Sequence, residues 1–206
     1  STSIPAGPAS RNPRPSLDIC WERYLYHYTR ACPGPWPGQT EFEYLASVLD
    51  GEPSCGHSAL DTLVRILTEG RIRGSHRLVR GLRAVISWTS RPPQELSAIR
   101  HWNRALGRWT FEPYGLAVNR QCLRKLGAKP AVYGADALFE RLPPQERFRF
   151  QVGNASRSLW RREREWRLLG DLQLDPRLDV LILVPDRTAA DRIAGEIPFP
   201  YRLVVS

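Results

Sequence analysis

Residues 160–169 read W-R-R-E-R-E-W-R-L-L and are followed by a turn at Gly170. The apolar end of this run and the glycine after it favour a strand over a helix. On an extended segment, Glu163 and Glu165 project to the same face, about 6.5–7 Å apart. Arg161 would share that face, and two carboxylates placed there need either arginine partners or a ligand. On a helix the stretch would form only a solvated charged surface, and that alternative stays open.

The segments on both sides of this stretch predict an α+β fold. Aromatic residues alternate with other residues over 21–28, which predicts an early strand. Further strands are expected at 84–88, 115–118, 131–133, 165–169, 180–184 and 202–205. Capping-box spacing predicts helices that begin at Thr40 and Ser58 and end near Gly51 and Gly70. Residues 94–102, 120–126, 135–141 and 188–195 are also expected to be helical. Helices thus come early and strands late, without the β-α-β alternation of a doubly wound sheet.

The chain of 206 residues is 42% hydrophobic, which fits one domain with its own core. We expect residues 1–16 to be disordered, because they are rich in Pro, Ser and Arg and carry little apolar surface. Residues 17–206 then form a single domain. The sequence has neither a long apolar run nor a signal-peptide pattern, so we expect a soluble, cytoplasmic protein without membrane contacts.

The four cysteines are widely and irregularly spaced, which argues against a disulfide framework. Cys32, Cys55 and His57 could be read as part of a zinc site, but the chain lacks paired C-x-x-C knuckles, and we expect no metal. The net charge of +9 points towards polyanionic partners. All but two of the 30 basic residues are arginine, however, and a GC-rich coding sequence alone produces such a skew. Base composition therefore explains part of the positive charge without any polyanionic partner.

Three other segments carry side chains suited to binding. His27 is flanked by aromatic residues at the end of a predicted strand and could donate a hydrogen bond to a ribose hydroxyl; the alternative is a core histidine bonded to a carbonyl. Ser87 opens a hydroxyl-rich strand end that could equally be a turn. Tyr114 lies in a loop (109–115) in which Pro and Gly force an irregular backbone; such loops line pockets or close the end of a core.

Taken in order, these segments resemble the DarT-type ADP-ribosyltransferases. The resemblance rests on the strand ending in His-Tyr-Thr (27–29), the helix running to ILTEGRIR (66–73), the strand ending at Ser87, and EREWRL (163–168) followed by VLILV (180–184). The later half, from Trp109 through Tyr114 and Val132-Tyr133 to W-x-x-E-x-E-W-R, is similar to an uncharacterised family linked with abortive phage resistance. Both likenesses are sets of spaced motifs rather than continuous similarity.

The resemblance implies an ADP-ribosyltransferase-like fold, with mixed or antiparallel sheets and N-terminal helices packed on them. It also implies a transferase of the glycosyltransferase class that uses NAD as substrate and releases nicotinamide. Glu165 corresponds to the acid that contacts the nicotinamide ribose, and Glu163 to the acid that positions or activates the acceptor. A carboxylate near the ribose would stabilise the positive charge that develops as nicotinamide leaves.

The other site residues are carried over in the same way. His27, Tyr28 and Thr29 would bind the nicotinamide half of NAD, Ser87 would support the NAD-binding face, and Arg80 would meet the pyrophosphate. Tyr114 is assigned to the same cofactor-binding set.

The implied activity is that of a toxin or anti-phage effector acting on DNA or RNA, with an antitoxin or immunity protein as a further partner. Two alternatives remain. One is a non-enzymatic basic module whose aromatic residues stack on nucleic-acid bases. The other is an RNA phosphate-transfer or cleavage enzyme that uses His27. In the enzymatic reading, the two acids and the His27 imidazole converge around one hollow.

Overall fold

A computed structural model describes residues 19–52, 55–76, 79–81, 83–105, 107–153 and 163–206. Its α-helices are α1 (Glu41–Leu49), α2 (Ala59–Glu69), α3 (Arg120–Lys125), α4 (Asp136–Arg141) and α6 (Arg187–Glu196). Its 3-10 helices are η2 (Trp21–Arg23), η3 (Pro93–Ala98), η4 (Pro144–Arg149) and η5 (Pro176–Leu178). Residues 1–16 and Arg161, for which the sequence made predictions, lie outside this described part.

Thirteen strands are present in the described residues. The longer ones are β1 (Tyr24–Tyr28), β3 (Val85–Thr89), β6 (Gly115–Asn119), β10 (Glu165–Leu169), β12 (Val180–Val184) and β13 (Arg202–Val205). The shorter ones are β2 (Arg71–Ile72), β4 (Trp102–Asn103), β5 (Arg108–Trp109), β7 (Lys129–Pro130), β8 (Val132–Gly134), β9 (Phe150–Val152) and β11 (Leu172–Gln173).

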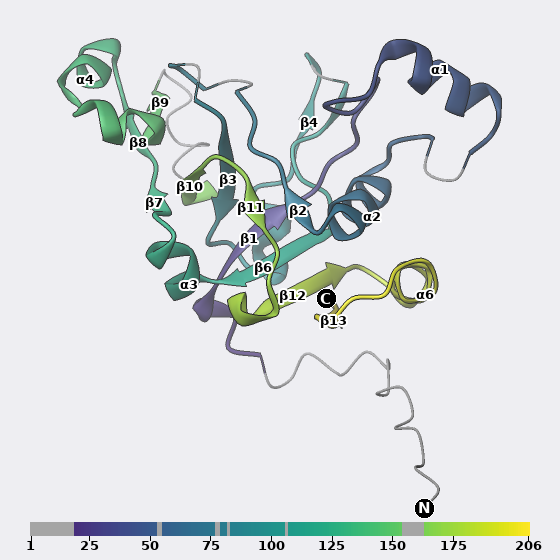
Figure 1. The fold of residues 1–206 in the computed structure, drawn as a ribbon. Coiled ribbons are helices and arrows are strands. Elements are labelled where there is room, and N and C mark those ends of the chain that lie inside the picture. The colour runs from purple at the N-terminus through teal and green to yellow at the C-terminus, as the bar shows by residue number, and fades with distance from the viewer. Residues whose placement is uncertain (1–18, 53–54, 77–78, 82, 106, 154–162) are drawn as a thin grey trace, which may run out of the picture.

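A seven-stranded sheet in the order β13-β12-β6-β1-β3-β10-β7 forms the centre of the molecule (Figure 1). Every neighbouring pair is antiparallel except β12 and β13, which are parallel. The expected α+β class with a mostly antiparallel sheet is therefore confirmed. The three strands predicted at 165–169, 180–184 and 202–205 have the predicted bounds, because their apolar runs are flanked by clear turn residues.

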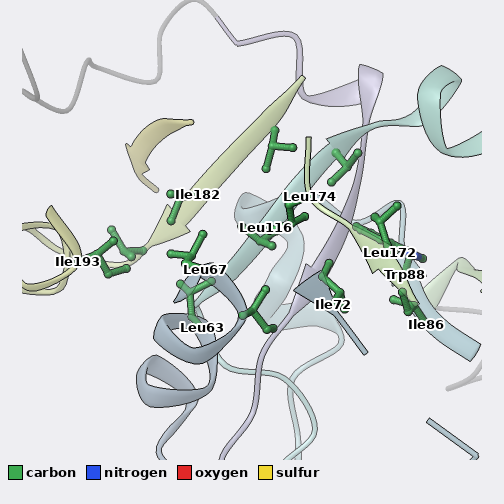
Figure 2. Packing of buried hydrophobic residues seen from close by; sticks show 14 of the residues in the cluster. Leu63, Leu67, Ile72, Ile86, Trp88, Leu116, Leu172, Leu174, Ile182 and Ile193 are labelled. Carbon is green, nitrogen blue, oxygen red and sulfur yellow. The ribbon is translucent and has the colours of Figure 1, made fainter. Parts of the chain in front are cut away.

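The larger core cluster lies between the sheet, α2 and α6. Leu63 and Leu67 of α2 pack towards Leu116 and Ile182 of the sheet, and Ile193 brings α6 to the same cluster (Figure 2). A second cluster contains the other side chains of the same strands, with Tyr26 and Tyr28 among them, and is covered by η3. Side chains that alternate along a strand point to opposite faces, so one short strand supplies both clusters.

Both predicted capping boxes are present. Thr40 accepts a hydrogen bond from the backbone of Glu43, and Ser58 accepts one from the backbone of Asp61. In each helix the acid returns a bond to the N-cap backbone, which satisfies amide groups that the first turn leaves unpaired. Gly70 ends α2 in the left-handed conformation, as its position predicts.

Two sequence predictions about helices are wrong. The resemblance implied that the N-terminal helices pack on the sheets, yet on α1 Phe42 is 81% and Leu49 86% exposed, because no described element covers that face. Residues 94–102 do not form one helix: η3 ends at Ala98, and Trp102 begins the β4–β5 hairpin. Pro92 and Pro93 lie at the start of this 3-10 helix, where a missing backbone N–H is tolerated. None of the described helices has the length and apolarity of a membrane span.

Candidate functional site

Ser87 on β3 connects the two residues on which the sequence analysis relied most. Its hydroxyl donates to Glu165 Oε1 over 3.0 Å, and its backbone oxygen lies 3.0 Å from Nδ1 of His27. His27, Ser87 and Glu165 come from β1, β3 and β10, which are neighbours in the central sheet although they lie far apart in the chain. The fold thus brings these three predicted residues together.

The Glu165 carboxyl group accepts three hydrogen bonds. Besides Ser87, Arg167 Nε donates to Oε1 over 2.8 Å, and the Tyr133 hydroxyl donates to Oε2 over 3.2 Å. The Glu165 side chain is only 9% exposed. Hydrogen bonds of this kind fix the orientation of a carboxyl group. Burial raises the pKa of Tyr133, and the charges of Glu165 and Glu163 raise it further. Tyr133 is therefore a donor, not a base.

Arg167, which binds Glu165, is itself held by further hydrogen bonds. Its guanidinium donates to the backbone oxygens of Phe148 and Phe150 and to the side-chain oxygen of Gln151. Its side chain is 3% exposed. Each edge of the planar guanidinium therefore has an acceptor, as a buried arginine requires. This network joins β10 to η4 and β9 and holds the carboxylate in one position.

Glu163 lies in a different environment from the one predicted. Its backbone is helical, and Arg164 with a φ of +47° separates it from β10, so the two acids do not lie on one strand. The backbone oxygens explain the bend: Glu163 O accepts from the Thr89 hydroxyl and Arg164 O from the Ser90 amide. The prediction of a single extended E-x-E segment is wrong on this point.

Glu163 and Glu165 nevertheless stay close enough to influence each other. Burial and, after it, the charge of Glu165 raise the pKa of Glu163 to about 7, against the lowering effect of Arg30. No described residue donates a hydrogen bond to the Glu163 carboxyl group. Burial lowers the pKa of Arg30 and so does Arg108, whereas the two acids raise it. Arg30 therefore lies close enough to both carboxylates for their charges to act on each other.

His27 is neutral at pH 7. Burial lowers its pKa to about 4, with the Ser87 hydrogen bond acting in the opposite direction and the charge of Arg30 adding to the decrease. Because a carbonyl oxygen can only accept, Nδ1 carries the proton and Nε2 is an acceptor. The predicted hydrogen bond to a ribose hydroxyl is thus reversed: Nε2 would accept it rather than donate it.

Gly115 lets β6 approach β1 beside His27. A Cβ atom at Gly115 would lie 2.4 Å from the His27 backbone oxygen. No side chain can therefore replace this hydrogen without moving one of the strands. The close approach fixes the end of β1 from which the imidazole extends.

The register of the sheet places His27 and Glu165 on opposite faces. Tyr26 pairs with Thr89, and Thr89 pairs in turn with Glu165, so Glu165 and Ser87 share one face and His27 takes the other, beside Trp88. The expected single hollow shared by the imidazole and the acids is therefore wrong. His27 and Glu165 are connected only through Ser87. Strands β1 and β3 pair at a single position, Tyr26 with Thr89, and beyond it the His27 imidazole binds the Ser87 backbone oxygen.

Tyr28 and Thr29 do not present their polar groups to a ligand. Tyr28 is 4% exposed, and its hydroxyl donates to the backbone oxygen of Arg91. Thr29 is 2% exposed, and its hydroxyl donates to the backbone oxygens of Ala59 and Tyr114. Their predicted contacts with a cofactor are corrected, because burial and these hydrogen bonds assign both side chains to the core.

Arg80 and Tyr114 lie away from the Glu165 cluster. Arg80 forms ion pairs with Asp136 and Glu140 of α4, and its guanidinium lies 4.5 Å from the centre of the Phe139 ring. A pyrophosphate would have to compete with these two acids. Tyr114 packs against the larger core cluster, and burial raises its pKa, followed by Asp186 and Glu112. The structure does not bring either residue to Glu165.

The described residues contain no group of three or more acids, histidines or cysteines arranged to hold a metal ion. His57 instead stacks on Trp36, with ring centres 3.5 Å apart. A hollow of about 440 Å³ lies beside β10 but is lined by Leu168, Leu169 and residues of β11 and η5, and by neither Glu165 nor His27.

Sequence reasoning missed the residues that hold the site together. The sequence predicted no role for Arg30 or Gln151, and Arg167 entered only as part of the charged stretch 160–169. Tyr133 entered only through the resemblance. A tyrosine and an arginine give no signal of their own in the sequence, since each becomes part of the site through a contact that the fold makes.

Comparisons with known proteins give no relative for this chain: no family model matches it, and neither does any curated protein or solved structure.

Proposed function

We propose that this chain is an NAD-dependent ADP-ribosyltransferase in which Glu165 is the catalytic carboxylate. One observation carries the proposal: hydrogen bonds connect His27 through Ser87 to Glu165. Three separate motifs, taken from three parts of the sequence, are thereby linked in space. A set of unrelated surface residues would not be expected to meet in this way.

The chemistry of the cluster suits this reaction. The bond between ribose C1′ and the nicotinamide nitrogen breaks, nicotinamide leaves with the electron pair, and positive charge develops on the ribose. Glu165 supplies a fixed negative charge, because its three donors hold it before the substrate arrives. His27 supports the cluster from the opposite face of the sheet, where its imidazole binds the Ser87 backbone oxygen.

Glu163 is the proposed base. The acceptor bonds to C1′ and must lose a proton, and a carboxyl group with a pKa of about 7 takes up that proton near neutral pH. The acceptor class rests on the net charge of +9, which favours DNA or RNA.

RNA cleavage by His27 has less support. A general acid at that position needs a protonated imidazole, and a pKa of about 4 leaves His27 uncharged at pH 7. A non-enzymatic nucleic-acid-binding module would explain the net charge, but it does not explain why Ser87 is hydrogen-bonded to Glu165.

The test uses the full chain with labelled NAD and separate pools of DNA, RNA and protein. Glu165→Gln should lower nicotinamide release by about 10²- to 10³-fold, as loss of a charge-stabilising group does elsewhere. Glu196→Gln, which alters an ion-paired carboxylate on α6, is the control and should stay fully active. Thermal unfolding of both variants shows whether the fold persists.

A folded Glu165→Gln protein with full activity would end the proposal. Salt-sensitive oligonucleotide binding without NAD consumption would favour the binding module instead.

A further inference from the structure

Two exposed apolar surfaces lie outside the candidate site. The α1 stripe consists of Phe42, Leu45, Val48 and Leu49. The Trp hairpin consists of β4 and β5, which carry Trp102 and Trp109, together with Arg100 and Arg104. These two elements contain six of the nine large apolar side chains that stay exposed in the described residues. Apolar surface gathered in this way marks an interaction site more often than chance.

The two surfaces have opposite charge. Four acids surround the α1 stripe: Glu41, Glu43, Asp50 and Glu52. The sequence has no lysine or arginine between Arg30 and Arg65. None of the four acids forms an ion pair with a described residue. The surface around the α1 stripe is therefore acidic, although the chain as a whole has a net charge of +9.

The Trp hairpin is basic. It carries Arg100, Arg104 and Arg108, and the sequence has no acid between Glu95 and Glu112. The two indole rings meet edge to face with centres 5.6 Å apart, and the Arg100 guanidinium lies 4.4 Å from the centre of the Trp109 ring. These contacts hold the aromatic groups in place while Trp102 stays 50% exposed.

Both surfaces flank one loop at the same end of the molecule. Arg108 of the hairpin donates to the backbone oxygen of Ala31 over 2.8 Å, at the start of the loop that leads to α1. At the other end of the loop, Trp36 stacks on His57, which also contacts Tyr44 of α1. Figure 1 shows α1 and β4 at this end.

From this arrangement we propose that two copies of the chain associate about a two-fold axis, with the α1 stripe of each copy on the Trp hairpin of the other. A two-fold interface uses the same surface on both copies, so a surface with an acidic and a basic half is self-complementary. Pairing α1 with α1 would place acids against acids, which opposes that alternative. Apolar contact between α1 and the indoles supplies the affinity, and the charges select the orientation.

The test follows the mass of the full chain by sedimentation velocity over a range of concentrations. The unchanged chain should form a dimer that weakens with added salt. Glu41→Lys with Asp50→Lys and Glu52→Lys changes the summed charge of the four acids from −4 to +2, and Arg100→Glu with Arg104→Glu changes that of the three hairpin arginines from +3 to −1. Each multiple variant alone should dimerise at least ten-fold more weakly. Mixed together, the two should form a heterodimer, because both contacts in the mixed pair become complementary.

An apolar variant tests the same contact without changing charge. Phe42→Ser with Leu49→Ser removes two highly exposed side chains and should abolish the dimer while leaving thermal unfolding of the monomer unchanged. A chain that stays monomeric at all concentrations would overturn the proposal, as would variants that dimerise like the unchanged chain. Oligonucleotide binding by a monomer through the Trp hairpin would assign that surface to nucleic acid instead.

Discussion

Glu165 and Glu163 are two residues apart, yet their surroundings are opposite. Glu165 accepts hydrogen bonds from three side chains and is tied to the buried Arg167. Glu163 has no such donor among the described residues, and burial raises its pKa to about 7. The difference teaches that two carboxylates close in the sequence can differ in both hydrogen bonding and burial, and the proposed function assigns them two tasks on that basis, a fixed charge and a proton acceptor.

The largest loss of stability should follow from removing the Arg167 guanidinium, which binds Glu165. Arg167→Ala leaves a buried carboxylate and two backbone oxygens without their donor, so we expect a loss of about 3–5 kcal/mol in the free energy of unfolding. Denaturant titration measures this loss. Arg167→Lys should restore only part of it, since an ammonium group cannot reproduce the planar fork.

The chain contains a matched control for Arg167. Arg177 and Asp175 have the same spacing, two residues apart, but Arg177 is 90% exposed. Arg177→Ala should leave the unfolding midpoint unchanged, because water replaces the lost contact. Equal effects of the two substitutions would show that burial does not distinguish the pairs.

A smaller effect should appear on the Glu163 side as pH changes. The folded chain holds the Glu163 proton more tightly than the unfolded chain, whose glutamate has a pKa of 4.5. Stability conferred by that proton is present below pH 4.5 and is lost as pH rises to about 7. Glu163→Gln cannot lose a proton, so its stability should exceed that of the unchanged chain above pH 7 by on the order of 2 kcal/mol.

Unfolding titrations at pH 5, 6, 7 and 8 measure this difference, which should shrink towards the acidic end. The same variant should lose the rise in nicotinamide release that a base with a pKa of about 7 produces. Parallel pH profiles for the two chains would remove Glu163 from the proposed role.

The smallest change in stability should come from removing the Ser87 hydroxyl, which binds Glu165. Ser87 is exposed, so Ser87→Ala should alter the free energy of unfolding by less than about 0.5 kcal/mol. Its hydroxyl orients Glu165, and losing that bond should reduce nicotinamide release about ten-fold. Ser97→Ala, at another exposed serine, is the control and should change neither quantity. A Ser87→Ala enzyme with full activity would show that the hydroxyl does not position Glu165.

Local sequence signals predicted much of the fold because their causes are local. The capping boxes at Thr40 and Ser58 involve residues three apart, so neighbours in the chain suffice to specify them. The strand at 180–184 is an unbroken apolar run with turn residues on both sides. The β4–β5 hairpin was missed, since two-residue strands show no alternation that could be read.

The sequence by itself determined the residue types: an E-x-E pair, an aromatic-flanked histidine, an apolar stripe with acids around it. Only the tertiary structure decided their surroundings. The left-handed Arg164 takes Glu163 off the strand, and the register turns His27 to the face opposite Glu165. Arg167 and Tyr133 become partners of Glu165 because the fold places them beside it. Charge state and hydrogen bonding depend on distances across the fold, which neighbours in sequence do not set.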